Sequence, residues 1–544
     1  MKKVTRLFIN AVMLTAITAY SASAINPEDS ARYYNWFNQD METDSIPGIG
    51  TNKAYNELLK NKNSSTVIVA VIDGGVDIKH HDLKGKIWVN ENEIPDNGID
   101  DDHNGYIDDV NGWNFLGGPD GKNLQYENYE ATRIYKKYKD RFSNADTLHL
   151  TGNDLQLFLM YKKARAVHFK KLNKALNEMS LIKKFEQNYF KADSIIKTNL
   201  RKDTFDIDDI KTIDTSDSKE FIMAKTMMLS LRENGFKMES LEKYKEHVEI
   251  QLNYHFNINY NPRTIVGDNP DDLSDSIYGN NDVIANTPDH GTFVSGIIAA
   301  DRNNHIGING IAGNVKIMPV RAVPDGDERD KDVANAIKYA VNNGAKIINM
   351  SFGKDFSPHK DFVDQAVRYA AAHDVLLVHA AGNESDDTDT DPRYPSDFDA
   401  GDQKITEAWL NVGATSMEPG NNFVASFSNY GKRSVDFFAP GVDIYSLMPD
   451  NKYDILDGTS FSSPMTAGAA ALIKSYYPDM TAVQIRNILI SSVSLRFKRE
   501  KVILPSKNED KKPKKVKFGK LSSTGGLLNV FNALNLCEYE SQAE

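Results

Sequence analysis

An uninterrupted seven-residue run rich in β-branched residues most strongly limits the folds open to this chain. Residues 66–72 read TVIVAVI and are followed at once by Asp73-Gly74-Gly75. A run without polar alternation is typical of a strand buried on both faces, as in parallel sheets covered by helices. Similar runs recur at 316–322, 346–350, 375–381 and 410–414, with helical patterns at 332–339 and 361–372. This alternation predicts an α/β fold with a doubly wound, mainly parallel sheet flanked by helices.

The stretch from about Asp120 to Tyr278 has a different composition and interrupts this pattern. It is rich in Lys, Glu and Asn, and its apolar residues recur at gaps of three and four, as in amphipathic helices. Three sets show the spacing: Phe169, Leu172, Leu176 and Met179; Phe221, Ala224, Met228 and Leu231; Leu241, Tyr244, Val248 and Leu252. We therefore expect a helical insertion at 120–278, which divides the α/β domain into 64–119 and 279–536. An arm at 25–63 and a tail at 537–544 complete the chain.

The first 24 residues have the pattern of a secretory signal peptide. A basic start with Lys2, Lys3 and Arg6 precedes an apolar stretch, and Ala22-Ser23-Ala24 is a small-x-small cleavage signature. With one cysteine, Cys537, no intramolecular disulfide can form. The net charge of −12 argues against general nucleic-acid binding. We expect an exported, periplasmic or extracellular monomer with no integral membrane segment once the signal is removed.

A hydroxyl-rich turn lies directly before an apolar run of small residues at Gly458–Leu472, which reads GTSFSSPMTAGAAAL. Pro464 is best tolerated near a helix start, so a buried helix should begin near Thr459 or Ser460. Ser460 would then lie at a helix N-terminus, where the macrodipole favours developing negative charge. From these residues alone, Ser460 is either a nucleophile or an ordinary N-capping serine.

A nucleophilic serine needs a base and a group that orients the base. Of 12 histidines, His290 heads a small-residue stretch, DHGTFVSGIIAA, that predicts a buried helix able to pack closely against the one headed by Ser460. Asp73 ends an apolar strand, where a carboxylate is costly to bury unless it is hydrogen-bonded. These two residues are the candidate base and orienting acid.

Three blocks of the sequence resemble the signature segments of the subtilisin-like serine peptidases. They are 71–77 (VIDGGVD), 290–296 (HGTFVSG) and 458–464 (GTSFSSP), in that order, and the resemblance covers about 67–116 and 290–534. It implies that Ser460 is the nucleophile, His290 the general base and acid, and Asp73 the residue that orients the imidazole. It also implies that Asn383 in Ala380-Ala381-Gly382-Asn383 stabilises the oxyanion.

The same resemblance implies a set of substrate-binding residues. Ser351, Phe352 and Gly353 would pair with substrate backbone as an added strand, and Ala380, Ala381 and Gly382 would form the opposite wall of the first specificity pocket. Glu384 and Arg393 fall near the rim and floor of that pocket. From Arg393 and Glu384 we hypothesise that a basic side chain before the scissile bond is disfavoured and an acidic one favoured.

Two departures from the family pattern leave the catalytic atoms in place. Phe293 stands where the family usually has a second histidine, and Phe461 where it often has a methionine that oxidises readily.

Two loops are candidates for structural Ca²⁺, and no organic cofactor is expected. The first has closely spaced oxygen ligands around a glycine turn, although its twelfth position is Asn111 and not glutamate; its ligands would be Asp100, Asp102, Asn104, Asp108 and Asp109. An acidic loop with Asx-turns is the alternative. The second site is implied by the resemblance, with the side chains of Asp82 and Asn304 and the carbonyls of Arg302, Ile306 and Ile308.

These observations predict a serine endopeptidase that cleaves peptide or protein substrates through an acyl-enzyme. Two alternatives stay open. One is a catalytically silent binding protein whose working surface is the helical insertion, although the intact triad and Asn383 speak against it. The other is a peptide ligase or cyclase, which would use the same triad.

Overall fold

The computed structural model describes residues 34–145, 149–214, 218–507 and 512–543. The signal-peptide prediction at 1–24 falls outside them. The described chain forms two compact units. One comprises residues 131–260, and the other comprises the segments up to Glu130 and from Asn261 onward. The separate helical unit is therefore shorter than the expected insertion, because residues 120–130 and 261–278 belong to the larger unit.

A seven-stranded, wholly parallel sheet is the centre of the larger unit, in the order β2-β3-β1-β4-β5-β6-β7. The strands are β1 (Val67–Asp73), β2 (Trp113–Asn114), β3 (Val315–Arg321), β4 (Ile347–Met350), β5 (Leu376–Ala380), β6 (Trp409–Thr415) and β7 (Phe437–Pro440). All five predicted strands are confirmed within one residue at each end. The order reverses at β1, which has β3 on one side and β4 on the other. A crevice forms at the carboxyl ends beside such a reversal.

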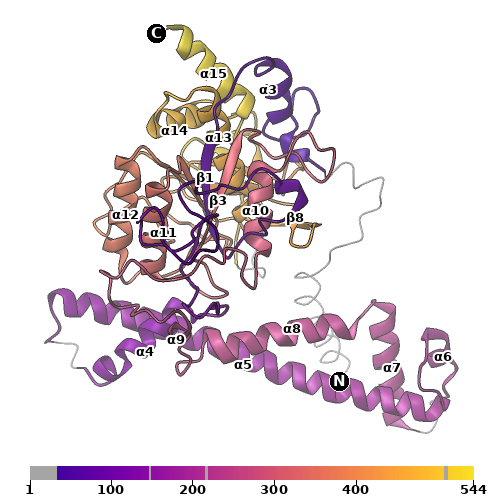
Figure 1. The fold of residues 1–544 in the computed structure, drawn as a ribbon. Helices are drawn as coiled ribbons and strands as arrows, with labels where there is room; N and C mark the ends of the chain where they lie inside the picture. Colours follow the sequence, from indigo (N-terminus) through magenta and orange to yellow (C-terminus); the bar gives the residue numbers. More distant parts are fainter. Residues whose placement is uncertain (1–33, 146–148, 215–217, 508–511, 544) are drawn as a thin grey trace. The chain divides into compact units, whose positions relative to one another are not determined.

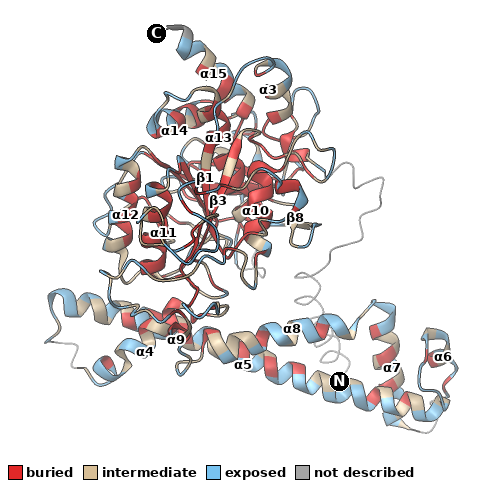
Figure 2. Ribbon diagram, viewed as in Figure 1, coloured by how far each residue is buried: buried red, intermediate tan, exposed pale blue. Residues whose placement is uncertain are grey.

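Helices cover both faces of this sheet, which is why most side chains in its strands are apolar. On one face, α10 (Asp289–Ala299), α13 (Thr459–Tyr476), α14 (Ala482–Ser491) and α15 (Val530–Ala543) enclose the larger core; on the other lie α11 (Asp330–Asn342) and α12 (Lys360–Ala372). Figure 1 shows α11 and α12 across the sheet from α10, and Figure 2 shows the buried centre between them. The doubly wound fold class is confirmed.

Close packing of α10 and α13 against neighbouring segments depends on small residues. A Cβ on Gly296 would lie 2.4 Å from Leu447 Cγ, and one on Gly468 would lie 2.9 Å from Ile311 Cβ. Both distances are shorter than real contacts allow, so glycine lets these helices lie tightly against their neighbours. The two helices carry His290 and Ser460 at their N-terminal ends.

Shorter elements complete the larger unit. They are η1 (Trp36–Asn38), α3 (Thr51–Glu57), η2 (His81–Leu83), α9 (Arg263–Val266), η5 (Phe518–Lys520) and the hairpins β8 (Ile444–Met448)–β9 (Lys452–Leu456) and β10 (Lys501–Ile503)–β11 (Lys515–Lys517). The N-terminal arm is part of the core, because Trp36 and Phe37 are fully buried. Val530 N–H at the start of α15 donates to Ile49 O in the arm, at 2.7 Å.

The smaller unit is helical, as the sequence predicts. It contains α4 (Glu130–Phe142, which begins in the larger unit), α5 (Gly152–Leu200), α6 (Ile207–Thr212), α7 (Lys219–Glu233), α8 (Met238–Ile250) and a π-helical turn, η4 (Gln251–His255). Ala224, Met228 and Leu231 of α7 pack against α5 and α6 in one core. α7 ends at Glu233, directly before Asn234-Gly235. Leu176, by contrast, is 49% exposed, so the apolar spacing on α5 does not mark a continuous buried face.

Candidate active site

The candidate catalytic residues gather at the carboxyl edge of the sheet because each lies at the end of an element. Asp73 is the last residue of β1, and Asn383 follows β5 by three residues. His290 and Ser460 are the second residues of α10 and α13. Four distant parts of the chain thus contribute one functional group each.

His290 and Asp73 are in direct contact. The imidazole Nδ1 lies 2.9 Å from both carboxylate oxygens of Asp73, and Oδ1 also accepts the Gly74 N–H at 2.7 Å. The Asp73 side chain is 4% exposed, whereas that of His290 is 40% exposed. Burial lowers the His290 pKa, but the charge and hydrogen bond of Asp73 raise it by more, so the pKa lies above its ordinary value. Nδ1 is held by the acid, so Nε2 is left for a reacting group.

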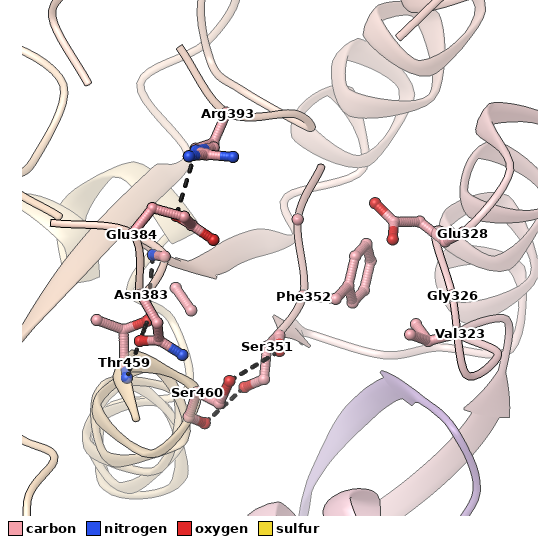
Figure 3. Close-up of a pocket in the computed structure, with 13 residues that line it drawn as sticks. Val323, Gly326, Glu328, Ser351, Phe352, Asn383, Glu384, Arg393, Thr459 and Ser460 are labelled. Carbon is pink, nitrogen blue, oxygen red and sulfur yellow. Dashed lines mark hydrogen bonds and ion pairs between the residues drawn. The ribbon is translucent and has the colours of Figure 1, made fainter. Parts of the chain in front are cut away.

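The Ser460 hydroxyl is turned toward the neighbouring strand end. Its Oγ donates to Ser351 O at 3.1 Å, and Ser351 Oγ donates back to Ser460 O at 2.8 Å (Figure 3). Pro464, the sixth residue of α13, explains the second bond. A proline has no N–H to offer the carbonyl four residues earlier, so Ser460 O is free to accept the Ser351 hydroxyl. The helix begins at Thr459, as predicted, but Pro464 lies beyond its first turn.

Asn383 is oriented by Thr459. Its Oδ1 accepts both the backbone N–H of Thr459 at 2.9 Å and the Thr459 hydroxyl at 2.8 Å. Thr459 Oγ1 also accepts the Gly382 N–H at 3.1 Å. With its oxygen occupied, Asn383 directs its amide nitrogen to the side on which Ser460 lies (Figure 3). An amide N–H beside a nucleophilic oxygen can stabilise a developing oxyanion.

A cavity of about 220 Å³ lies beside Ser460. Most of the predicted substrate-binding residues line it, namely Ser351, Phe352, Gly353, Ala380, Gly382, Glu384 and Arg393. Ala381 is not among the lining residues and is buried. The cavity is also lined by Val323, Gly326, Glu328 and Thr459, which sequence reasoning missed because the first three lie in a loop without a recognised motif.

Arg393 lies in the cavity wall within a cluster of carboxylates. Its guanidinium forms ion pairs with Asp355, with Asp386 at 2.7 Å and with Glu384 at 3.3 Å, and its side chain is 12% exposed. Both predicted pocket residues, Arg393 and Glu384, therefore face the cavity and contact each other.

Comparison with known proteins identifies the family. The model of the subtilase family matches residues 64–519. The chain belongs to the subtilase family. A thermophilic serine proteinase from a Bacillus species is 41% identical over 187 residues, 34% of this chain and 42% of that protein. Subtilisin DY from Bacillus licheniformis is 37% identical over 207 residues, 38% of this chain and 70% of the relative.

The matched region thus spans less than half of the first of these relatives. Among solved structures, proteases from Pseudoalteromonas arctica align at 27% identity with a TM-score of 0.36, over 45% of this chain and 70% of that one.

The first candidate calcium loop of this subtilase brings several carboxylates together in one turn. Ligand atoms of Asp100, Asp102 and Glu93 lie within 4.8 Å of one another. Glu93 was missed in the sequence because it lies seven residues before the motif. Asp108 instead accepts the N–H groups of Asn97 and Gly98.

Asp109 and Asn104 face each other within the same turn. Asp109 is buried and accepts the Tyr339 hydroxyl at 2.6 Å and the Asn104 amide at 3.2 Å. Burial raises the pKa of Asp109 to about 6.

The second candidate calcium loop brings Asp82 and Asn304 together. Asn304 Nδ2 donates to Asp82 Oδ1 at 2.6 Å, and the Ile308 N–H contacts Asp82 Oδ2 at 3.3 Å. Asp82 is fully buried, and burial raises its pKa. The Arg302 guanidinium donates to Gly310 O, and the Ile306 N–H donates to Asn304 Oδ1, so the loop folds around Asp82.

Proposed function

We propose that this subtilase is a serine endopeptidase that hydrolyses peptide bonds through an acyl-enzyme. The observation that carries the proposal is the Asp73–His290 pair, with both carboxylate oxygens 2.9 Å from Nδ1, at the sheet edge where Ser460 and Asn383 also lie. An imidazole held through Nδ1 by a buried carboxylate is suited to take a proton from a serine hydroxyl through Nε2.

The reaction would proceed in two steps. The Ser460 hydroxyl turns from Ser351 O toward His290, loses its proton to Nε2 and attacks the substrate carbonyl, while Asn383 Nδ2 and the Ser460 N–H donate to the oxyanion. His290 then protonates the departing amine. Water, deprotonated by His290, hydrolyses the ester and restores Ser460. Substrate backbone would pair with 351–353 as an added strand.

Labelling with a fluorophosphonate tests this proposal. Unmodified protein should form a covalent adduct that Ser460→Ala abolishes, while Ser462→Ala, a buried hydroxyl two residues away, should fold and keep the label if Ser460 is the reactive oxygen. Absence of Ser460-dependent labelling in the presence of Ca²⁺ would favour the silent binding protein. Peptide products then separate hydrolysis from transfer, because a ligase or cyclase would yield joined or circular peptides in place of free ends.

Two further features of the proposal concern ions and location. The hard oxygen ligands of Glu93, Asp100 and Asp102 suit Ca²⁺, as does the loop that folds around Asp82, and in both places the ion would have a structural role. We also propose export through the segment at 1–24. None of the described helices is both long enough and apolar enough to cross a membrane.

The helical insertion is proposed to restrict access of large substrates. Its entry segment lies along the loop that lines the cavity: Glu127 N–H donates to Asp325 O, and Glu130 N–H to Asp327 Oδ2 at 2.7 Å. The chain thus leaves the larger unit for the insertion beside the cavity loop, and surface loops tolerate insertions and carry function.

A further inference from the structure

The cavity beside Ser460 carries more negative than positive charge. Three of the residues that line it are ionisable: Glu328, Glu384 and Arg393. Glu384 keeps 38% of its side chain exposed. Figure 3 shows the carboxylates of Glu384 and Glu328 on either side of the Phe352 ring. Glu328 is 2% exposed, so Glu384 is the carboxylate that a bound peptide would meet.

The positive charge of Arg393 is already offset within the protein. Its guanidinium contacts the carboxylates of Asp355, Glu384 and Asp386, and Lys507 Nζ lies 2.6 Å from Asp386. Both cations are thus fixed in ion pairs. A substrate carboxylate would have to compete with those pairs for Arg393, whereas a substrate cation could approach the exposed part of Glu384 directly.

The positive charge of Lys354, the residue after the substrate-binding segment, is also balanced by carboxylates. Its Nζ lies 2.9 Å from Glu130 and 2.8 Å from Asp330, and its side chain is 2% exposed. This buried lysine therefore presents no charge to a substrate.

The two loops that flank the cavity add to the negative field. Residues 325–330 read DGDERD, with four acids and one arginine, and Arg329 pairs with Glu127 at 2.7 Å. Residues 384–391 read ESDDTDTD, with five acids and no basic residue. The pKa of Tyr430 is raised by burial and by the charges of Asp387 and Asp386. Clefts lined by one sign of charge concentrate ligands of the opposite sign.

We infer that the cleft selects basic polypeptides, with a lysine or arginine side chain beside Glu384 next to the scissile bond. This inference rests on the proposed peptidase function. It replaces the expectation, drawn from the sequence, of an acidic side chain at the first position. That expectation counted Arg393 as an available cation, whereas the structure surrounds it with carboxylates.

The test uses three peptides that differ only in the residue before the scissile bond, which is Lys, Gln or Glu. We expect kcat/KM to fall in that order. At low salt, kcat/KM for the Lys peptide should exceed that for the Glu peptide by about tenfold or more. The ratio should shrink at high salt, because ions screen exposed charges. Glu384→Gln should reduce the Lys preference, and Glu418→Gln, an exposed carboxylate outside the cavity lining, should preserve it.

The three peptides distinguish failure of this inference from failure of the proposed function. Cleavage of any of the three peptides reports peptidase activity itself, and absence of cleavage of all three would overturn both. Cleavage of the Gln peptide with the Glu peptide preferred to, or equal to, the Lys peptide would overturn the inference alone. Should Glu384→Gln misfold after Arg393 loses a partner, the salt dependence of the unmodified protein decides the matter. A Lys-to-Glu ratio that salt does not change would contradict the inference.

Discussion

At the scale of single residues, the charge of His290 links the proposed catalysis to stability. Asp73 stabilises the protonated imidazole and raises its pKa above the ordinary value of 6.5. That stabilisation is fully present below the unfolded-state pKa and is lost as pH rises through the folded-state pKa. Catalysis needs the neutral imidazole. Activity should therefore appear over the same pH interval in which this contribution to the free energy of unfolding disappears.

The pH dependence of kcat/KM checks this expectation. We predict an acid limb centred above 6.5, the ordinary imidazole pKa. Asp73→Asn should shift the limb to lower pH, because the neutral amide no longer favours the imidazolium, and should lower kcat on the order of 10⁴-fold. A limb centred below the ordinary value, or one that Asp73→Asn leaves in place, would refute the assigned role of the pair.

Asn383 gives a second prediction at this scale. Asn383→Ala should lower kcat by about 10²- to 10³-fold with little change in KM, because the lost hydrogen bond forms only with the oxyanion. Thr459→Val should cause a smaller loss, since the backbone N–H of Thr459 still holds Asn383 Oδ1. Steady-state kinetics on one peptide measure both. Equal losses in KM and kcat for Asn383→Ala would instead indicate a ground-state contact.

At the scale of elements, the sequence predicts those helices and strands whose positions follow from local periodicity and burial. The apolar run before Asp73 marks β1, and the small residues after His290 and Ser460 mark α10 and α13. What the sequence could not predict depends on contacts between distant segments. Glu328 reaches the cavity, Thr459 orients Asn383, and Ser351 uses the carbonyl that Pro464 leaves open. No local sequence pattern predicts these contacts between distant residues.

The acidic turn around Asp100 supports a prediction about metal removal. A chelator should lower the Tm of the unmodified protein, and added Ca²⁺ should restore it, because an ion bound only by the folded state stabilises that state by mass action. The double variant Asp100→Asn, Asp102→Asn should lose part of this response. Asp479→Asn, an exposed carboxylate elsewhere, is the control. A Tm that changes with neither chelator nor added Ca²⁺ would rule out a structural ion.

At the scale of the whole molecule, the helical unit is a distinct body with its own core. Replacing residues 131–260 with a short flexible linker should leave short-peptide cleavage nearly unchanged. Cleavage of a folded protein substrate should become faster, because the proposed barrier to large substrates is gone. Parallel assays on a peptide and a folded protein measure the difference. Unchanged cleavage of the folded protein would remove the access role from the insertion.

Contacts between segments that lie far apart in the sequence also affect how late in synthesis the larger unit can fold. The central strand β1 pairs from Val67 with Val315, and the arm receives a hydrogen bond from Val530 at the start of the last helix. Such long-range pairings close large loops and slow folding. The larger unit should therefore complete its fold only after α15 has been synthesised. The proposed peptidase activity should accordingly be absent from a nascent chain that still lacks this helix.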